Sequence, residues 1–122
     1  MHEIADSVHH EYNTTISIDI SQKTKDYGLS MKERLELMLM YKKALLMLAG
    51  YTQAKQITVT LESKKDDFLL KLLADSELVN KFDDRIEKAL EDIKQRAAQI
   101  QCETDLQASD SFTAFTAIIK HR

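Results

Sequence analysis

The segment QITVTLESKKDDFLLKLLA, residues 56–74, holds the pattern that decides the fold. Over 56–61, polar residues alternate with apolar and β-branched ones, which is typical of a strand with one buried face. The polar residues 63–66 predict a turn, and 68–73 predicts a second strand that pairs back on the first. Because the apolar run of this second strand is nearly continuous, we expect it to be central in a sheet or buried on both faces.

The segments on either side of this hairpin alternate between helical and strand patterns. Upstream, apolar residues at helical spacing over 1–11 precede a β-branched strand over 14–20. Downstream, one long apolar stripe predicts a helix over 76–101, and strands follow over 103–108 and 112–120. With the central helix described next, the order is α-β-α-β-β-α-β-β. This order predicts the α+β class: one domain over all 122 residues, a two-layer α/β sandwich in which helices cover one face of a mixed sheet.

A central helix is expected to begin after Ser30, which forms the sequence pattern of a capping box with Glu33. It should run to about Leu48, with Gly50 as its terminator. The helix is rich in leucine and methionine on more than one face, so we expect most of it to be core. The alternative is that one face of the helix 30–49 is buried in a homodimer.

The amino-acid composition indicates which kinds of binding partner and which cellular compartment to expect. A formal net charge of −3 and a pI of about 5.8 give no indication of a nucleic-acid or anionic-membrane partner. The most apolar segment, 35–49, is too short and too charged to cross a bilayer. The single cysteine, Cys102, cannot form an internal disulfide, which favours the cytoplasm, and we expect it to be a small buried hydrophobe rather than a nucleophile. There are only 2 glycines and no proline, so a glycine-rich ligand loop is hard to build.

Five segments agree with one known family in order and spacing: 41–45, 53–59, 71–75, 90–100 and 113–119. On them the chain resembles the ATP-binding catalytic domain of two-component sensor histidine kinases, whose fold is shared with the Hsp90, MutL and gyrase ATP domains. The resemblance extends from about Ile16 to Ile119 and is closest to the short-lid kinases of the NarL/DesK-like class. It implies binding of ATP with Mg²⁺ and transfer of a phosphoryl group to a histidine on a separate dimerisation domain.

The resemblance also implies a set of site positions, and this chain departs from most of them. The family's glutamate base position is Lys43, and its magnesium-binding asparagine pair is Leu46 and Met47, whose side chains carry no oxygen for a hard cation. The adenine-binding aspartate is retained as Asp75, and a threonine of the closing strand is retained as Thr113. The positions of the family's glycines carry other residues: Glu77, Val79, Glu87, Ala89, Gln101, Cys102 and Phe112.

These replacements are mostly helix formers and apolar side chains. We therefore expect the lid to have become part of the downstream helix and the nucleotide pocket to be filled. The corresponding function is a non-catalytic domain, engineered or a pseudokinase, with no catalytic residue, no metal and no cofactor. The alternatives are an interaction module of a degenerate sensor kinase, which would bind a partner through the former ATP face, and a still functional ATP-binding domain.

The histidines near the N-terminus offer two further readings. His9-His10-Glu11 has the acidic neighbour of a phosphoacceptor histidine, but the family places that residue on a separate helical hairpin. A metal site with His2 lacks the HExxH spacing that aligns two ligands on one helix face. We expect these histidines, and His121 near the C-terminus, to be exposed surface residues.

Overall fold

The computed structural model describes residues 4–6, 14–20, 28–64, 67–78 and 84–120. Residues 4–6 are helical, and Ala5 is buried. The elements that follow are β1 (Thr15–Ile20), α3 (Met31–Tyr51), β2 (Gln56–Lys64), β3 (Asp67–Ala74), α4 (Asp84–Ala98), β4 (Cys102–Ala108) and β5 (Thr113–Lys120). This is the order predicted from the sequence.

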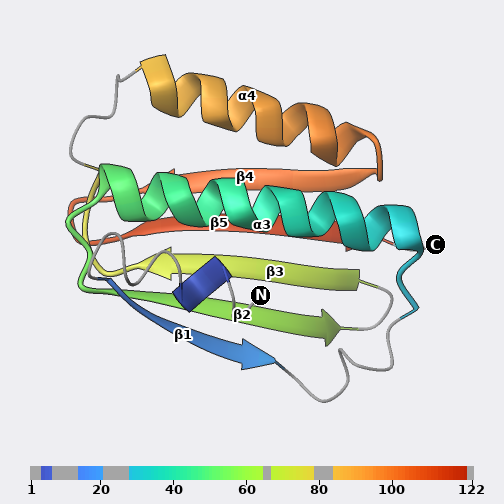
Figure 1. Cartoon of the computed structure of the whole chain (residues 1–122), viewed down its shortest axis with the longest axis horizontal. Coiled ribbons are helices and arrows are strands. Elements are labelled where there is room, and N and C mark those ends of the chain that lie inside the picture. Colours follow the sequence, from blue (N-terminus) through green and yellow to red (C-terminus); the bar gives the residue numbers. More distant parts are fainter. Residues whose placement is uncertain (1–3, 7–13, 21–27, 65–66, 79–83, 121–122) are drawn as a thin grey trace.

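The five strands form one mixed sheet in the order β1-β2-β3-β5-β4. β1 pairs with β2 in parallel, and the other neighbours are antiparallel. Helices α3 and α4 lie side by side on one face of this sheet (Figure 1), and the main core fills the space between the helices and the strands. The predicted two-layer α+β sandwich is therefore confirmed.

Strand β3 lies at the centre of the sheet, as its apolar run predicted, but it is not buried on both faces. Leu70 and Leu72 are fully buried toward the helices, whereas Leu73 on the opposite face is 36% exposed. Because both long helices cover the same face, the other face meets solvent. The predicted turn over 63–66 is also too long, because Lys64 and Asp67 already pair in the β2–β3 register.

The start of α3 follows the sequence, and its end does not. Ser30 and Glu33 form the predicted capping box, with reciprocal hydrogen bonds of 2.9 and 3.1 Å. Gly50, however, is helical and does not terminate α3. The helix ends at Tyr51 and is capped by Thr52, whose backbone N–H and hydroxyl both donate to the Leu48 carbonyl, at 3.2 and 2.5 Å. The end of the helix is thus capped by the Thr52 side chain, without a glycine.

Helix α4 is shorter than the predicted helix over 76–101. Ser76 and Glu77 are not helical, and Leu78 forms an isolated antiparallel bridge with Thr52. This tertiary contact holds the segment in an extended conformation and overrides its helix propensity. Within the helix predicted over 76–101, Ser76 to Leu78 are therefore not helical, whereas Asp84 to Ala98 are.

The chain leaves α4 through a residue with a left-handed backbone, Gln101, at φ 51°. It lies at one of the positions where the resembled family has glycine. A side chain costs roughly 1–2 kcal/mol in this region, because Cβ approaches the following carbonyl oxygen.

Replacing Gln101 by glycine is expected to raise the free energy of unfolding by about 1 kcal/mol. The gain should be measured by urea denaturation followed by far-UV circular dichroism. The control is Gln99→Gly, two residues earlier, where the backbone φ is not positive and glycine brings no relief. A gain of the same size in both variants would contradict the strain at Gln101.

Candidate functional site

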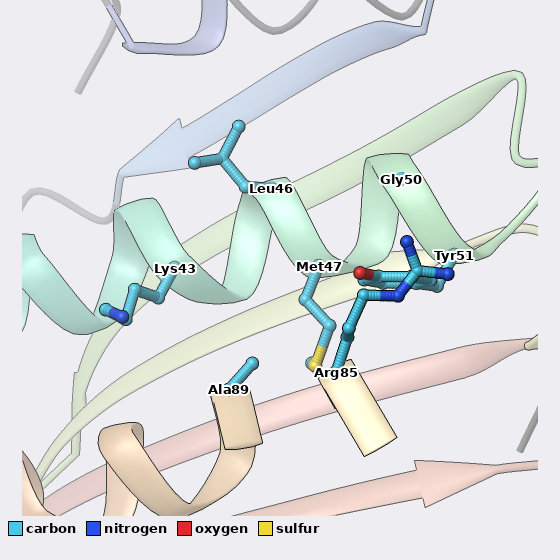
Figure 2. A pocket seen from close by; sticks show the side chains of 7 residues that line it. All are labelled: Lys43, Leu46, Met47, Gly50, Tyr51, Arg85 and Ala89. Atoms are coloured by element: carbon cyan, nitrogen blue, oxygen red, sulfur yellow. The ribbon is translucent and has the colours of Figure 1, made fainter. Parts of the chain in front are cut away.

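A cavity of about 420 Å³ lies between α3 and α4 and gathers most of the positions that the resemblance assigns to magnesium and phosphates. Figure 2 shows its seven lining residues: Lys43, Leu46, Met47, Gly50, Tyr51, Arg85 and Ala89. The structure thus brings the predicted base position, the predicted asparagine pair and a predicted lid position into one place.

Lys43 occupies the base position, and it is held by an ion pair with Asp92 on α4. The hydrogen bond from Lys43 is the main cause that lowers the pKa of the Asp92 carboxyl below its ordinary value of 3.8. Asp92 is therefore ionised at neutral pH, and on acidification the pair is lost as the pH falls through that lowered pKa. An ammonium group paired in this way bridges the two helices and cannot accept a proton from a nucleophilic water.

Met47 and Leu46 stand at the asparagine positions, and they differ in burial. Met47 is 2% exposed and forms a second apolar cluster with Leu78 and Ile86. In Figure 2 it points from α3 toward α4, whereas Leu46 points away from α4. Because successive helical residues are rotated by about 100°, only Met47 can fill the space between the helices. Met47 thus fills part of the space between the helices, and a cavity remains open beside Leu46.

Two lining residues were not identified from the sequence, Tyr51 and Arg85. The Arg85 guanidinium lies over the Tyr51 ring, 5.3 Å from its centroid (Figure 2). This arrangement is a cation–π contact that links the end of α3 to the start of α4. Both residues could have been found from their spacing to predicted site positions. Tyr51 lies four residues after Met47, and Arg85 lies four residues before Ala89. Residues four apart share one face of a helix.

The two retained positions, Asp75 and Thr113, lie apart from the α3–α4 cavity and serve the backbone. The Asp75 Oδ1 accepts hydrogen bonds from the backbone N–H groups of Lys55 and Gln56, at 3.1 and 3.4 Å. Thr113 is fully buried, and its hydroxyl donates to the Ser76 carbonyl at 3.0 Å. Both contacts fix the loop after β3 against the start of β2 and β5.

Asp75 also lines a separate polar cavity of about 400 Å³, together with Gln53, Ser76, Glu77, Asp110 and Ser111. Three of its six lining residues are acidic, which disfavours a phosphate group there. Among the described residues, no group of three or more His, Cys, Asp or Glu side chains is arranged to hold a metal ion.

Replacing Asp75 by alanine is expected to lower the free energy of unfolding by about 1 kcal/mol. Two exposed backbone N–H groups would then donate to water instead of to the carboxylate. Asp75→Asn keeps the Oδ1 acceptor and should retain most of the stability in urea denaturation. Asp110→Ala, in the same cavity, is the control and should change the stability by less than about 0.5 kcal/mol. Unchanged stability of Asp75→Ala would refute the capping role.

The remaining predicted positions do not converge on a site. Glu77 and Glu87 are exposed, Phe112 is 37% exposed, and Val79 lies outside the described residues. The histidines at 2, 9, 10 and 121 also lie outside them. Cys102 is half-buried, and its burial raises the pKa of the thiol to about 11, so the reactive thiolate is scarce at neutral pH. No helix among the residues that the structure describes is long and apolar enough to span a membrane.

Comparison with solved structures identifies the fold. Over 98% of its length the chain matches the histidine kinase domain of the blue-light-activated histidine kinase of Erythrobacter litoralis, with a TM-score of 0.80, 8% identity and 58% of that chain covered. The histidine kinase AdeS of Acinetobacter baumannii matches with a TM-score of 0.71 and 11% identity, over 98% of this chain and 64% of AdeS. Full-length ShkA in complex with AMPPNP matches with a TM-score of 0.71 and 10% identity, over 97% of this chain and 28% of ShkA.

The chain therefore has the fold of an HATPase-type catalytic domain, as found in sensor histidine kinases. It spans between 28% and 64% of the length of these three structures. No protein-family model and no curated protein matches the sequence.

Proposed function

We propose that this chain is a non-catalytic domain of the histidine-kinase ATPase fold that does not bind ATP with Mg²⁺. The observation that carries the proposal is the Lys43–Asp92 ion pair, which occupies the base position of the α3–α4 cavity. The proposal covers both origins inferred from the sequence, an engineered scaffold and a pseudokinase.

The chemistry of the cavity lining supports the absence of a magnesium site. Mg²⁺ is held in proteins by carboxylate and other oxygen ligands in a near-octahedral arrangement. The side chains that line the cavity carry a thioether, alkyl groups, two cations and a phenol, and none carries a carboxylate or an amide. The residues present do not fit the metal, and the Arg85 cation would repel it.

The use of Asp75 supports the absence of an adenine site. In the resembled family this carboxylate accepts a hydrogen bond from the adenine amino group. Here its Oδ1 accepts two backbone hydrogen bonds at the start of β2, and Asp75 does not line the α3–α4 cavity.

Isothermal titration calorimetry of the chain with AMPPNP and Mg²⁺ is expected to give no binding heat up to about 1 mM nucleotide. A dissociation constant above about 1 mM means a binding free energy weaker than roughly 4 kcal/mol. ShkA, which is solved with AMPPNP, is the positive control in the same buffer. Titration without Mg²⁺ tests whether the cations Lys43 and Arg85 bind the phosphates directly. A Mg²⁺-dependent dissociation constant in the micromolar range would sink the proposal and favour a functional ATP-binding domain.

A further inference from the structure

The N-terminal half of α3 carries three apolar side chains that face solvent. Met31 is 82% exposed, Leu35 is 59% exposed and Met38 is 36% exposed. Their spacing of four and three residues places them in one row on the helix surface. They are three of the six large hydrophobic residues exposed in the described part of the chain, and they form one stripe.

An apolar cavity of about 250 Å³ adjoins this stripe. Its lining residues belong to α3, β2 and β3, apart from Leu29 just before α3. Figure 1 shows the start of α3 at the same end of the sheet as the end of β2 and the start of β3. The cavity-lining residues are Leu29, Arg34, Leu37, Met38, Tyr41, Leu61, Phe68 and Leu70. Seven of the eight are apolar or aromatic, so the cavity suits an inserted hydrophobic side chain.

Exposed cations flank the stripe and the cavity. Lys32 and Arg34 are exposed on this half of α3, Lys42 is exposed just beyond it, and Arg34 also lines the cavity. The acidic residues of the same half are engaged within the chain: the Glu33 carboxylate accepts from the Ser30 N–H, and Glu36 pairs with Arg96 at 3.4 Å. The surface thus presents an apolar row and an apolar cavity beside exposed cations.

We propose that this surface, defined by Met31, Leu35, Met38 and the adjoining cavity, docks an acidic amphipathic helix of another protein or domain. One apolar residue of that helix enters the cavity, and its other apolar residues cover the row. Acidic residues beside its apolar face pair with Lys32, Arg34 and Lys42. Met31 and Met38 are separated by about 10 Å along α3, so a partner helix of about three turns covers the row.

The observations favour this partner over two other occupants. A second copy of the chain would place the same cations against each other, which costs affinity. A membrane would take up projecting apolar side chains but would not use an adjoining cavity of side-chain size. The surface lies at the opposite end of α3 from the α3–α4 cavity. The proposal therefore does not depend on the absence of nucleotide binding, and the two tests can fail separately.

The test is a selection on the full chain from a displayed library of helical peptides. The library has a fixed leucine stripe, and Glu, Lys or Gln varies at the flanking positions. Peptides that also bind the Met38→Lys variant are removed. We expect the retained peptides to be enriched in Glu at the flanking positions. Retention of no peptide, or enrichment of Lys, would overturn the proposal.

The best peptide is then synthesised and its affinity measured by fluorescence anisotropy. Met38→Lys should weaken binding at least tenfold, because it removes an anchor contact and adds a charge beside the cavity. Arg34→Glu should weaken it roughly three- to tenfold and reduce its salt dependence. The matched control is Leu73→Lys, since Leu73 is also 36% exposed but lies on the open face of the sheet. It should leave the affinity unchanged, and circular dichroism should show that each variant is folded.

Two further measurements distinguish the other occupants. Co-sedimentation with vesicles of phosphatidylserine and phosphatidylcholine should recover no protein. Light scattering on a size-exclusion column should show the same mass at all protein concentrations. Vesicle binding that Met38→Lys abolishes, or a dimer that Leu35→Glu dissociates, would replace the acidic helix with a membrane or a second copy.

Discussion

Replacing Phe115 by alanine is expected to lower the free energy of unfolding by about 3–5 kcal/mol. Phe115 is fully buried on β5, between Leu72 on β3 and Leu106 on β4 in the strand register. It is one of the two largest fully buried side chains of the described core, with Tyr41. Because β3 and α3 are fixed by many other contacts, the surroundings cannot collapse completely, and the cavity left behind adds to the lost transfer free energy. Urea denaturation followed by circular dichroism measures the loss.

The matched control is Phe112→Ala, which removes the same side chain three residues earlier. Phe112 is 37% exposed at the β4–β5 turn, so its removal leaves no internal cavity. We expect a change of less than about 1 kcal/mol there. Similar losses in the two variants would show that Phe115 does not have the core position described above. This comparison also tests the closing strand on which the family resemblance partly rested.

The existence and the type of the elements could be predicted from the sequence because each long element has a clear period. The alternation over Gln56 to Leu61 and the apolar stripe through Ile86, Ile93 and Ala97 both correspond to observed elements. The start of α3 was predictable as well, since a capping box is formed by residues three apart and is therefore local.

The errors arose where contacts distant in the sequence decide the backbone. The end of α3 depends on Thr52, which caps the helix and also bridges Leu78. The same bridge keeps Leu78 out of α4, although the segment around it is rich in helix formers. Neither effect follows from local propensity, because the two partners are separated by 26 residues in the sequence. Gly50 was expected to end the helix, but a helical glycine costs only about 1 kcal/mol, and the packing of α3 tolerates it.

The sequence indicated which residues of α3 line the candidate site, but it did not indicate the side-chain contacts that they make. The resemblance placed Lys43, Leu46 and Met47 together, and the structure does so. It could not reveal that Asp92 neutralises Lys43 or that Arg85 covers Tyr51, because each pair joins two helices. Sequence reasoning treated the retained residue Asp75 as a ligand remnant, whereas its contacts assign it to the backbone at the start of β2.

Met47→Asn is expected to lower the free energy of unfolding by about 2–4 kcal/mol. It restores the type of side chain that the resembled family uses for magnesium, but at a position that is 2% exposed and packed against Leu78 and Ile86. The amide would be buried without a partner from that apolar cluster, and the cluster would lose a flexible side chain that fills it. Urea denaturation measures the loss, and thermal melting with and without AMPPNP and Mg²⁺ measures any ligand effect.

Leu46→Asn is the matched control, because it makes the same kind of change on the adjacent residue. Leu46 is half-buried and points away from α4, so the new amide remains accessible to water, and we expect a loss of less than about 1 kcal/mol. Neither variant should melt at a higher temperature when AMPPNP and Mg²⁺ are added, because a ligand stabilises only a protein that binds it. A rise confined to Met47→Asn would mean that one apolar residue blocks an otherwise intact nucleotide site. The absence of a rise, together with the large loss of stability, would mean that Met47 and its neighbours Leu78 and Ile86 serve the core.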